Sequence, residues 1–338
     1  MYSLIKKCLF ALPPETAHHL TLQSLKCADR LKLLEFFLKN PSHPLTIMGL
    51  SFQNPIGLAA GLDKNADYVD ALSHLGFGFI EVGTVTPKPQ YGNPKPRLFR
   101  LIKEEALLNR MGFNSKGALY VAKQLKKMRY RGILGINIGK NKETPLENAV
   151  DDYLFCFHQL CSFASYITIN ISSPNTKNLR DLQASDALIP LLSALKKAQK
   201  KYAEEKKYVP LVVKISPDLS DEALFELAEI LLQQKIDGVI ATNTTVNRNG
   251  IESLYAKEEG GLSGKPLEKK STEIIKKLHT ILQDKIPIIA SGGVMDEQSA
   301  QEKLEAGATL LQIYTGFIYQ GPGFIQRLVK AYIHSASI

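Results

Sequence analysis

The sequence has few cysteines and no long apolar run. Four cysteines in 338 residues are too few for a disulfide framework and fit a reducing compartment. No apolar stretch approaches the roughly 20 residues that a membrane-spanning helix needs. The charge-free stretch 153–176 contains polar side chains and a proline, so we expect a helix and a buried strand there. The first 40 residues lack the pattern of a secretory signal, and we expect none.

Motifs of several enzyme classes are also missing. There is no H-E-x-x-H or C-x-x-C sequence and the seven histidines are scattered, so we expect no metal site. The G-x-S-x-G elbow of serine hydrolases is absent. No G-x-G-x-x-G follows an apolar run, and Gly264-Lys265-Pro266 has the wrong residue after the lysine for a P-loop. These absences argue against the common nucleotide-binding open sheets.

The chain does carry an excess of positive charge, with 42 basic and 33 acidic side chains and a net charge of +9. A basic balance is compatible with nucleic acid, an anionic membrane surface or acidic small molecules. No basic stripe with interleaved aromatic residues is visible, so we expect no nucleic-acid partner. Residues 1–40 hold six basic and three acidic side chains, and therefore +3 of the total.

Eight short apolar runs follow residue 55, with helical patterns between them. The runs are rich in Ile, Val and Leu and do not alternate with polar residues, as in parallel strands buried on both faces. Eight strand–helix repeats predict an α/β protein with a (β/α)8 TIM barrel, and a doubly wound open sheet is the alternative. The expected strands are 56–61, 79–84, 133–138, 166–171, 210–215, 237–242, 286–291 and 309–315, and the expected helices include 117–128, 186–204, 220–233, 266–282 and 296–306.

The first 44 residues do not follow this repeat. Two helices are expected, at 3–10 and from Glu15 to about Leu38, separated by a proline pair. They could cap the floor of the barrel, or they could form a basic amphipathic pair that attaches to a membrane surface. The basic charge is compatible with the second interpretation. We therefore expect an N-terminal helical segment at 1–44 and a barrel at 45–338.

Function in such a barrel concentrates where the strands end and the following loops begin. Gly292-Gly293 follows the seventh expected strand, and Tyr314-Thr315-Gly316 lies at the end of the eighth. These are the positions where such barrels bind phosphate through backbone amides. Ordinary tight turns could explain either group alone, but the two together favour a phosphate ligand.

Neutral amides and two lysines also fall at the expected mouth of the barrel. A single asparagine in a loop is usually a turn residue, but five at one face suggest recognition of a ring with alternating donors and acceptors, since each amide offers both. Lys64 and Lys214 would add cations for a carboxylate or a developing flavin anion. The asparagines are Asn109, Asn137, Asn170, Asn175 and Asn243.

Six blocks occur in order along the chain: NPIGLAAGLDK at 54–64, EVGTVTP at 81–87, NRMGFN at 109–114, NIGKN at 137–141, NISSPNT at 170–176 and GGLSG at 260–264. With these blocks the sequence resembles the dihydroorotate dehydrogenases, the FMN enzymes of pyrimidine synthesis, over essentially its whole length. It is similar to the class 2, quinone-reducing branch. Ser173 stands where the soluble class 1 enzymes carry a catalytic cysteine, and an N-terminal helical segment is typical of class 2.

The resemblance implies oxidation of (S)-dihydroorotate to orotate, with one FMN per chain as hydride acceptor and a membrane quinone as final electron acceptor. It also implies a peripheral protein on the cytoplasmic face of the cell membrane, and we expect a monomer. Two alternatives stay open. One is the same chemistry with a soluble acceptor, and the other is a phosphate-binding barrel lyase or isomerase without flavin.

The resemblance assigns roles to individual residues. Ser173 is the implied base; we expect Thr176 to pass the proton on and Lys214 to act beside the flavin. The implied quinone passage involves His18, Arg100 and Tyr314. The implied FMN-binding residues are Ala60, Gly61, Leu62, Asp63, Lys64, Thr84, Asn137, Asn170, Lys214, Thr242, Gly264, Gly293, Tyr314 and Thr315. The implied substrate-binding residues are Lys64, Asn109, Arg110, Met111, Gly112, Phe113, Asn170, Asn175, Asn243 and Thr244.

Overall fold

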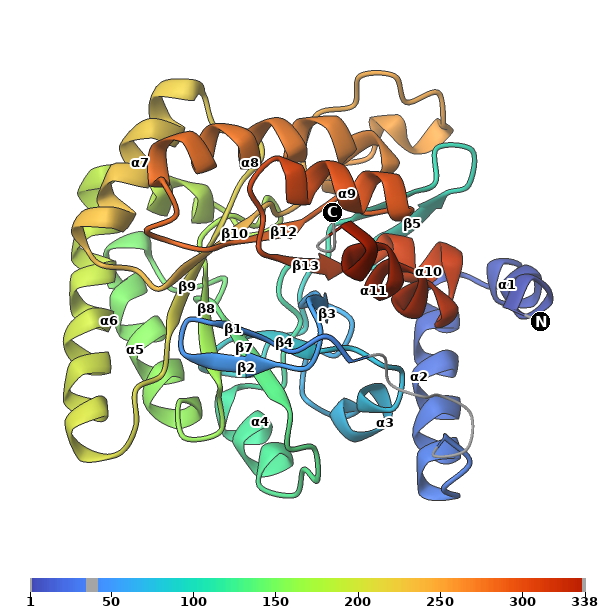
Figure 1. The fold of residues 1–338 in the computed structure, drawn as a ribbon, viewed down its shortest axis with the longest axis horizontal. Helices are drawn as coiled ribbons and strands as arrows, with labels where there is room; N and C mark the ends of the chain where they lie inside the picture. Colours follow the sequence, from blue (N-terminus) through green and yellow to red (C-terminus); the bar gives the residue numbers. More distant parts are fainter. Residues whose placement is uncertain (1, 35–41, 336–338) are drawn as a thin grey trace.

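The computed structural model describes residues 2–34 and 42–335 and shows a closed barrel of eight parallel strands surrounded by helices (Figure 1). The prediction of a (β/α)8 barrel with an N-terminal helical extension is therefore confirmed. The barrel strands, in order around the barrel, are β3 (Ile56–Leu58), β4 (Phe79–Val85), β7 (Ile133–Ile138), β8 (Tyr166–Asn170), β9 (Leu211–Ile215), β10 (Gly238–Ala241), β12 (Ile288–Ser291) and β13 (Leu310–Ile313).

Each barrel strand leads to a helix on the outside of the barrel. The helix after β9 begins with an N-cap, because Ser220 Oγ accepts a hydrogen bond from the Ala223 amide at 3.2 Å. Within the described ranges, no helix is long and apolar enough for a bilayer crossing. The helices are α3 (Val69–Ser73), α4 (Ala118–Leu125), α5 (Ala149–Leu160), α6 (Ser185–Glu205), α7 (Asp221–Gln233), α8 (Glu268–Leu282), α9 (Glu297–Glu305), α10 (Thr315–Gln320) and α11 (Gly323–Ser335).

Two helices precede the barrel, drawn in blue in Figure 1: α1 (Tyr2–Phe10) and α2 (Pro14–Arg30). The second helix ends at Arg30, earlier than expected, and the last part of the expected range lies outside the described residues. α1 is attached to α10, where the Tyr2 hydroxyl donates to the Ile318 carbonyl at 2.5 Å. α2 packs beside α3 and β5 (Leu98–Leu101).

The floor of the barrel is closed by the short hairpin of β1 (Leu45–Ile47) and β2 (Leu50–Phe52), not by the N-terminal helices among the described residues. Phe52 enters the barrel from this hairpin and packs edge-to-face on Phe79, with the ring centroids 5.2 Å apart. The rest of this internal layer comes from alternate positions around the barrel, as is typical of the fold. Its other fully buried members are Tyr166, Val212, Ile240, Ile289 and Leu310.

A small antiparallel sheet that the sequence did not predict lies beyond the opposite end of the barrel. It consists of β5, β6 (Ala106–Asn109) and β11 (Gly261–Gly264), in the order β11-β6-β5. Its strands have four residues each; β5 and β6 form a local hairpin, and β11 joins them from a loop far away in the chain. They carry their own small core, and Asn109 at the end of β6 reaches the candidate site.

We predict that Phe79→Ala lowers the free energy of unfolding by about 3–5 kcal/mol, because a fully buried ring is lost between the hairpin and the barrel. Urea unfolding followed by circular dichroism measures this loss. Phe225→Ala on α7 is the matched control, since that ring is 56% exposed and its removal costs at most about 0.5 kcal/mol. Equal losses in the two variants would contradict the assignment of Phe79 to the core.

Candidate active site

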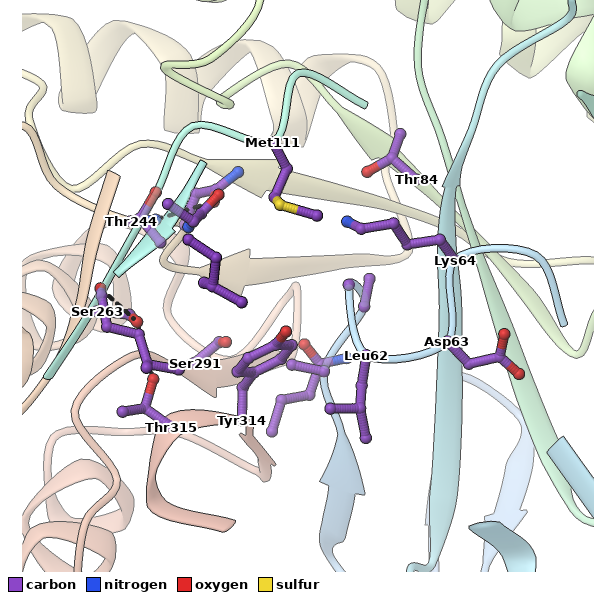
Figure 2. A pocket seen from close by; sticks show the side chains of 18 of the residues that line it. Leu62, Asp63, Lys64, Thr84, Met111, Thr244, Ser263, Ser291, Tyr314 and Thr315 are labelled. Carbon is purple, nitrogen blue, oxygen red and sulfur yellow. Dashed lines mark hydrogen bonds between the residues drawn. The ribbon is translucent and has the colours of Figure 1, made fainter. Parts of the chain in front are cut away.

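A cavity of about 400 Å3 opens where the barrel strands end, and its volume suits a small-molecule ligand (Figure 2). The structure brings most of the sequence-predicted site residues into its wall. From the expected FMN set the wall contains Ala60, Gly61, Leu62, Asp63, Lys64, Thr84, Asn170, Lys214, Thr242, Gly264, Gly293, Tyr314 and Thr315. From the other expected sets it contains His18, Asn109, Met111, Gly112, Phe113, Ser173, Asn175, Asn243 and Thr244.

One end of the cavity has the backbone geometry of an anion site. Gly292 and Gly293 follow β12 with φ angles of +98° and +72°, and a Cβ atom at Gly293 would stand 2.2 Å from Glu268 Cα. Only glycine fits this close approach in the left-handed region. Nearby, Thr315 opens α10, and its hydroxyl is hydrogen-bonded to the Ser263 hydroxyl at 2.8 Å. Backbone amides and hydroxyls of this kind hold phosphate groups.

Three of the five asparagines, Asn137, Asn170 and Asn243, are connected by hydrogen bonds, and Asn109 and Asn175 form a second pair. Asn170 donates to Thr84 Oγ1 at 2.9 Å and to Asn137 Oδ1 at 3.0 Å, and Asn243 donates to Asn170 Oδ1 at 3.3 Å. Asn137 is fully buried and also accepts from Thr84 at 2.6 Å, so it lies behind the wall and supports Thr84 and Asn170. Its side chain is occupied by these partners and by Glu81.

Three amide oxygens at the cavity are buried and have no hydrogen-bond partner in the described part of the chain: Asn114 Oδ1, Asn175 Oδ1 and Gln312 Oε1. An unpartnered buried acceptor costs free energy, and a ligand with N–H donors would remove that cost. Asn175 is held in place because its own amide donates to Asn109 Oδ1 at 3.0 Å. The cavity therefore suits a planar ring that carries N–H groups, such as a pyrimidine or an isoalloxazine.

Lys64 follows β3 and reaches into the cavity from the side opposite Met111 (Figure 2). Its loop is fixed by Asp63, whose carboxylate accepts hydrogen bonds from the amides of Asp67 and Tyr68 at 3.0 and 2.7 Å. Desolvation, with a further contribution from Arg97, lowers the pKa of Lys64 to about 8, although its side chain keeps some accessible surface in the cavity. The ammonium ion is thus poorly compensated and suits an anionic ligand group.

Lys214 lies on β9, next to Asn170 on β8, and its ammonium group borders the cavity. Burial lowers its pKa, and the negative charge of Glu81 opposes that shift. Glu81 is itself fully buried inside the barrel. A lysine at this depth brings positive charge to a ligand in a water-poor site, where such charge acts strongly.

Ser173 borders the cavity from the loop after β8, and its hydroxyl accepts a hydrogen bond from the backbone N–H of Asn175 at 3.3 Å. Arg180 fixes this loop by donating to the Ser172 carbonyl at 3.1 Å and to the Thr244 carbonyl at 3.0 Å. Thr176 is buried outside the cavity wall, and its hydroxyl lacks a partner among the described residues. Thr176 is three residues after Ser173 in the same loop.

Two of the predicted site residues, Arg110 and Arg100, do not line the cavity. The Arg110 guanidinium stacks over the Phe99 ring at 4.9 Å, pairs with Glu258 and donates to the Pro96 carbonyl at 2.9 Å, so only the backbone of Arg110 is near the cavity. Arg100 covers the Phe10 ring at 4.1 Å and donates to the Phe10 carbonyl at 3.0 Å. It fastens the α1–α2 connection and lies outside the cavity wall.

The cavity continues as far as α2. His18 from α2 lines it together with Tyr314 from the end of β13. Burial, with smaller contributions from His19 and Lys64, lowers the pKa of His18 to about 4, so the imidazole is neutral near pH 7. Burial raises the pKa of Tyr314 to about 12. This end of the cavity therefore has two uncharged rings, which suit an apolar or aromatic ligand.

Sequence reasoning missed several residues of the site. Gln312 lies inside the last strand, where an apolar run hid it, although a polar residue within such a run is a usable signal. Ser263 and Leu107 come from the unexpected antiparallel sheet. Asn114 ends the 109–114 motif and Ser291 ends the expected strand 286–291, but neither was assigned a role. The cavity wall also contains Leu267, Val294 and Met295.

Comparisons with known proteins agree with this geometry. The family model for dihydroorotate dehydrogenase matches residues 44–335. Proteins named dihydroorotate dehydrogenase (quinone) from Acinetobacter baylyi and Idiomarina loihiensis are 54% and 56% identical over 333 and 332 residues, in each case 98% of this chain and 99% of the relative. A crystal structure of DHODH from Eimeria tenella in complex with ferulenol has a TM-score of 0.86 at 37% identity and covers 96% of this chain and 94% of its own. The chain therefore belongs to the dihydroorotate dehydrogenase family, in the class 2, quinone-type branch, and is an oxidoreductase.

Proposed function

We propose that this chain oxidises dihydroorotate to orotate with one bound FMN and passes the electrons to a membrane quinone. The observation that carries the proposal is the continuous cavity that runs from the Gly292-Gly293 turn, past Lys64 and Ser173, to His18 on α2. It offers an anion site, a polar ring site and an exit beside the neutral rings of His18 and Tyr314 in one space.

The residues present fit FMN. The Gly292-Gly293 turn and Thr315 would hold the phosphate, while Thr84, Asn170 and Lys214 would contact the ring. FMN, when bound, accepts a hydride and releases electrons singly or in pairs. Lys214 would stabilise negative charge on the ring, because burial leaves its ammonium ion few competing partners.

Dihydroorotate would lie on the Lys64 side of the cavity. Its carboxylate would pair with the Lys64 ammonium, and its ring N–H groups would donate to the free oxygen of Asn175 and to neighbouring amides. The backbone of residues 109–113 would complete this site. Amides that are fixed by one another orient the ring without rearranging during the reaction.

Ser173 would remove the proton from C5 of dihydroorotate while the hydride leaves C6. A serine hydroxyl is a weak base, so it needs an outlet for its own proton and exclusion of water. Ser173 is buried, and the unpartnered Thr176 hydroxyl is a suitable second member of a proton path.

The quinone would reach the flavin between α2 and the barrel, past His18 and Tyr314, with Arg100 holding the α1–α2 connection. Residues 1–44 would then form the membrane-associating segment and residues 45–338 the FMN barrel. Leu4, Leu20 and Leu31 are exposed on this segment and suit contact with lipid. We place the protein peripherally on the cytoplasmic face of the cell membrane, as a monomer.

The purified protein is expected to be yellow, with the two visible absorption bands of FMN, and to reduce a quinone only when dihydroorotate is present. Absorbance spectra and quinone reduction measured with and without dihydroorotate test both parts. A colourless protein that cannot be reconstituted with FMN would leave a flavin-free barrel lyase or isomerase as the better interpretation.

Ser173→Ala is expected to slow flavin reduction by dihydroorotate about 10²–10⁴-fold, because general base catalysis contributes that much. FMN should stay bound, since Ser173 touches neither the glycine turn nor Lys214. Stopped-flow absorbance under anaerobic conditions measures the rate. Ser193→Ala, an exposed serine on α6, is the control, and an unchanged rate in Ser173→Ala would eliminate Ser173 as the base.

The efficiency kcat/KM for dihydroorotate is expected to fall as the pH rises through about 8, because Lys64 then loses the proton that attracts the substrate carboxylate. Below that pH the ammonium form predominates and the efficiency is constant with respect to this group. Lys64→Arg should remove the decline, since arginine stays protonated. A decline that persists unchanged in Lys64→Arg would assign it to another group.

A further inference from the structure

We infer that Glu15 of α2 is a positioning residue for the dihydroorotate half of the reaction, acting through Arg97 and Asn93 on the substrate-binding loops. The inference rests on the proposed function. It gives the N-terminal segment a role in substrate binding, in addition to its proposed role on the quinone side.

The first link is an ion pair between α2 and the barrel. Arg97 Nη2 donates to Glu15 Oε1 at 2.8 Å, and Arg97 Nε lies 3.4 Å from Glu15 Oε2. The Arg97 side chain is only 9% exposed, so this is a shielded fork between guanidinium and carboxylate. Lys95, whose side chain is largely exposed, lies 3.7 Å from Glu15, and the negative charge of Glu15 also acts on Lys64 across the cavity.

The second link is between Arg97 and the loop that precedes β5. Arg97 Nη1 donates to the carbonyl of Tyr91 at 2.6 Å and to the carbonyl of Asn93 at 3.1 Å. The Arg97 carbonyl accepts from the Arg110 amide at 2.9 Å. The buried Arg97 guanidinium thus binds α2 through Nε and Nη2, and it binds the 91–93 loop through Nη1.

The third link joins this loop to both substrate-binding loops. The backbone N–H of Asn93 donates to the Met111 carbonyl at 3.0 Å. Its side chain donates to the carbonyl of Arg110 at 3.0 Å and to the carbonyl of Asn175 at 3.3 Å. Met111 and Asn175 both border the cavity. Asn93 therefore fixes the spacing between the two loops that would close over dihydroorotate.

Loss of the Glu15 carboxylate would leave the buried Arg97 charge without its partner. A buried charge that loses its partner is strongly destabilised, so Arg97 would move toward water and release the carbonyls of Tyr91 and Asn93. The substrate loops would then be less ordered before binding, and ordering them would weaken affinity. Lys214 is not part of this connection, and Ser173 meets it through the backbone N–H of Asn175 at 3.3 Å, so the chemical step would be affected less than substrate binding.

The chain contains a matched control at the other end of α2. Asp29 pairs with His74 at 3.1 Å and with Arg129 at 2.7 Å. It is 8% exposed, so it is as well shielded as Arg97. Neither His74 nor Arg129 lines the cavity. Asp29→Asn thus weakens the attachment of α2 without disturbing the connection to the substrate loops.

The test is orotate binding to the FMN-loaded, full-length protein, measured by calorimetry at pH 7. Glu15→Gln is expected to weaken orotate binding about tenfold, while Asp29→Asn stays within about twofold of the parent. Anaerobic stopped flow should show the same split: in Glu15→Gln the dihydroorotate concentration for half-maximal flavin reduction rises about tenfold, and the rate at saturation stays within about twofold.

Asn93→Ala is the second variant, because it removes the last link and keeps the ion pair; it should also weaken orotate binding about tenfold. Unchanged affinity in both Glu15→Gln and Asn93→Ala would overturn the inference. Equal weakening in Glu15→Gln and Asp29→Asn would overturn it too, since general loosening of α2 would then be the cause. If the parent protein itself fails to bind orotate, the proposed function is wrong, and that outcome is distinct from the other two.

Discussion

A buried carboxylate inside the barrel constrains most of the active site. Glu81 on β4 is fully shielded from water, and a charge in such a place is tolerated only when it is fully hydrogen-bonded. It accepts from Asn137 on β7 at 2.9 Å, from Tyr166 and Thr168 on β8 at 3.0 and 3.1 Å, and from Gln312 on β13 at 2.7 Å. These strands must therefore keep their register, and polar side chains must occupy the layer directly below the cavity.

The layers of the barrel follow from this arrangement. Below Glu81, aromatic and aliphatic side chains pack against the β1–β2 hairpin and close the floor. Above it, Asn137 accepts hydrogen bonds from Thr84 and Asn170 and so fixes these two side chains, which reach the cavity. Lys214 brings a positive charge to the same level, so the polar layer contains charges of both signs. A stable apolar floor and a fixed polar mouth are thus built from the same eight strands.

Much of this could be predicted from the sequence, because its signals are local. Runs such as 133–138 and 166–171 identified all eight barrel strands, and the glycine pair and asparagines marked the strand ends. The parts that depend on distant contacts could not be predicted. β5, β6 and β11 are strands only because they pair with one another. Arg110 points outward because Phe99 and Glu258 attract its guanidinium, and the stop of α2 at Arg30 has no clear sequence signal.

The same carboxyl group also gives the amide network a direction. Its two oxygens accept hydrogen bonds from four side chains, whereas each asparagine amide can be turned either way round. Because Asn137 must present its NH2 group to Glu81, its oxygen faces Asn170, which in turn presents its NH2 group and leaves its oxygen to Asn243. The orientation of Asn243 follows, and its oxygen accepts from the Thr244 amide at 2.9 Å. The pattern of donors and acceptors that a ligand meets at the mouth is thus set by a group inside the barrel, which lies one hydrogen bond behind Gln312 and two behind Asn170.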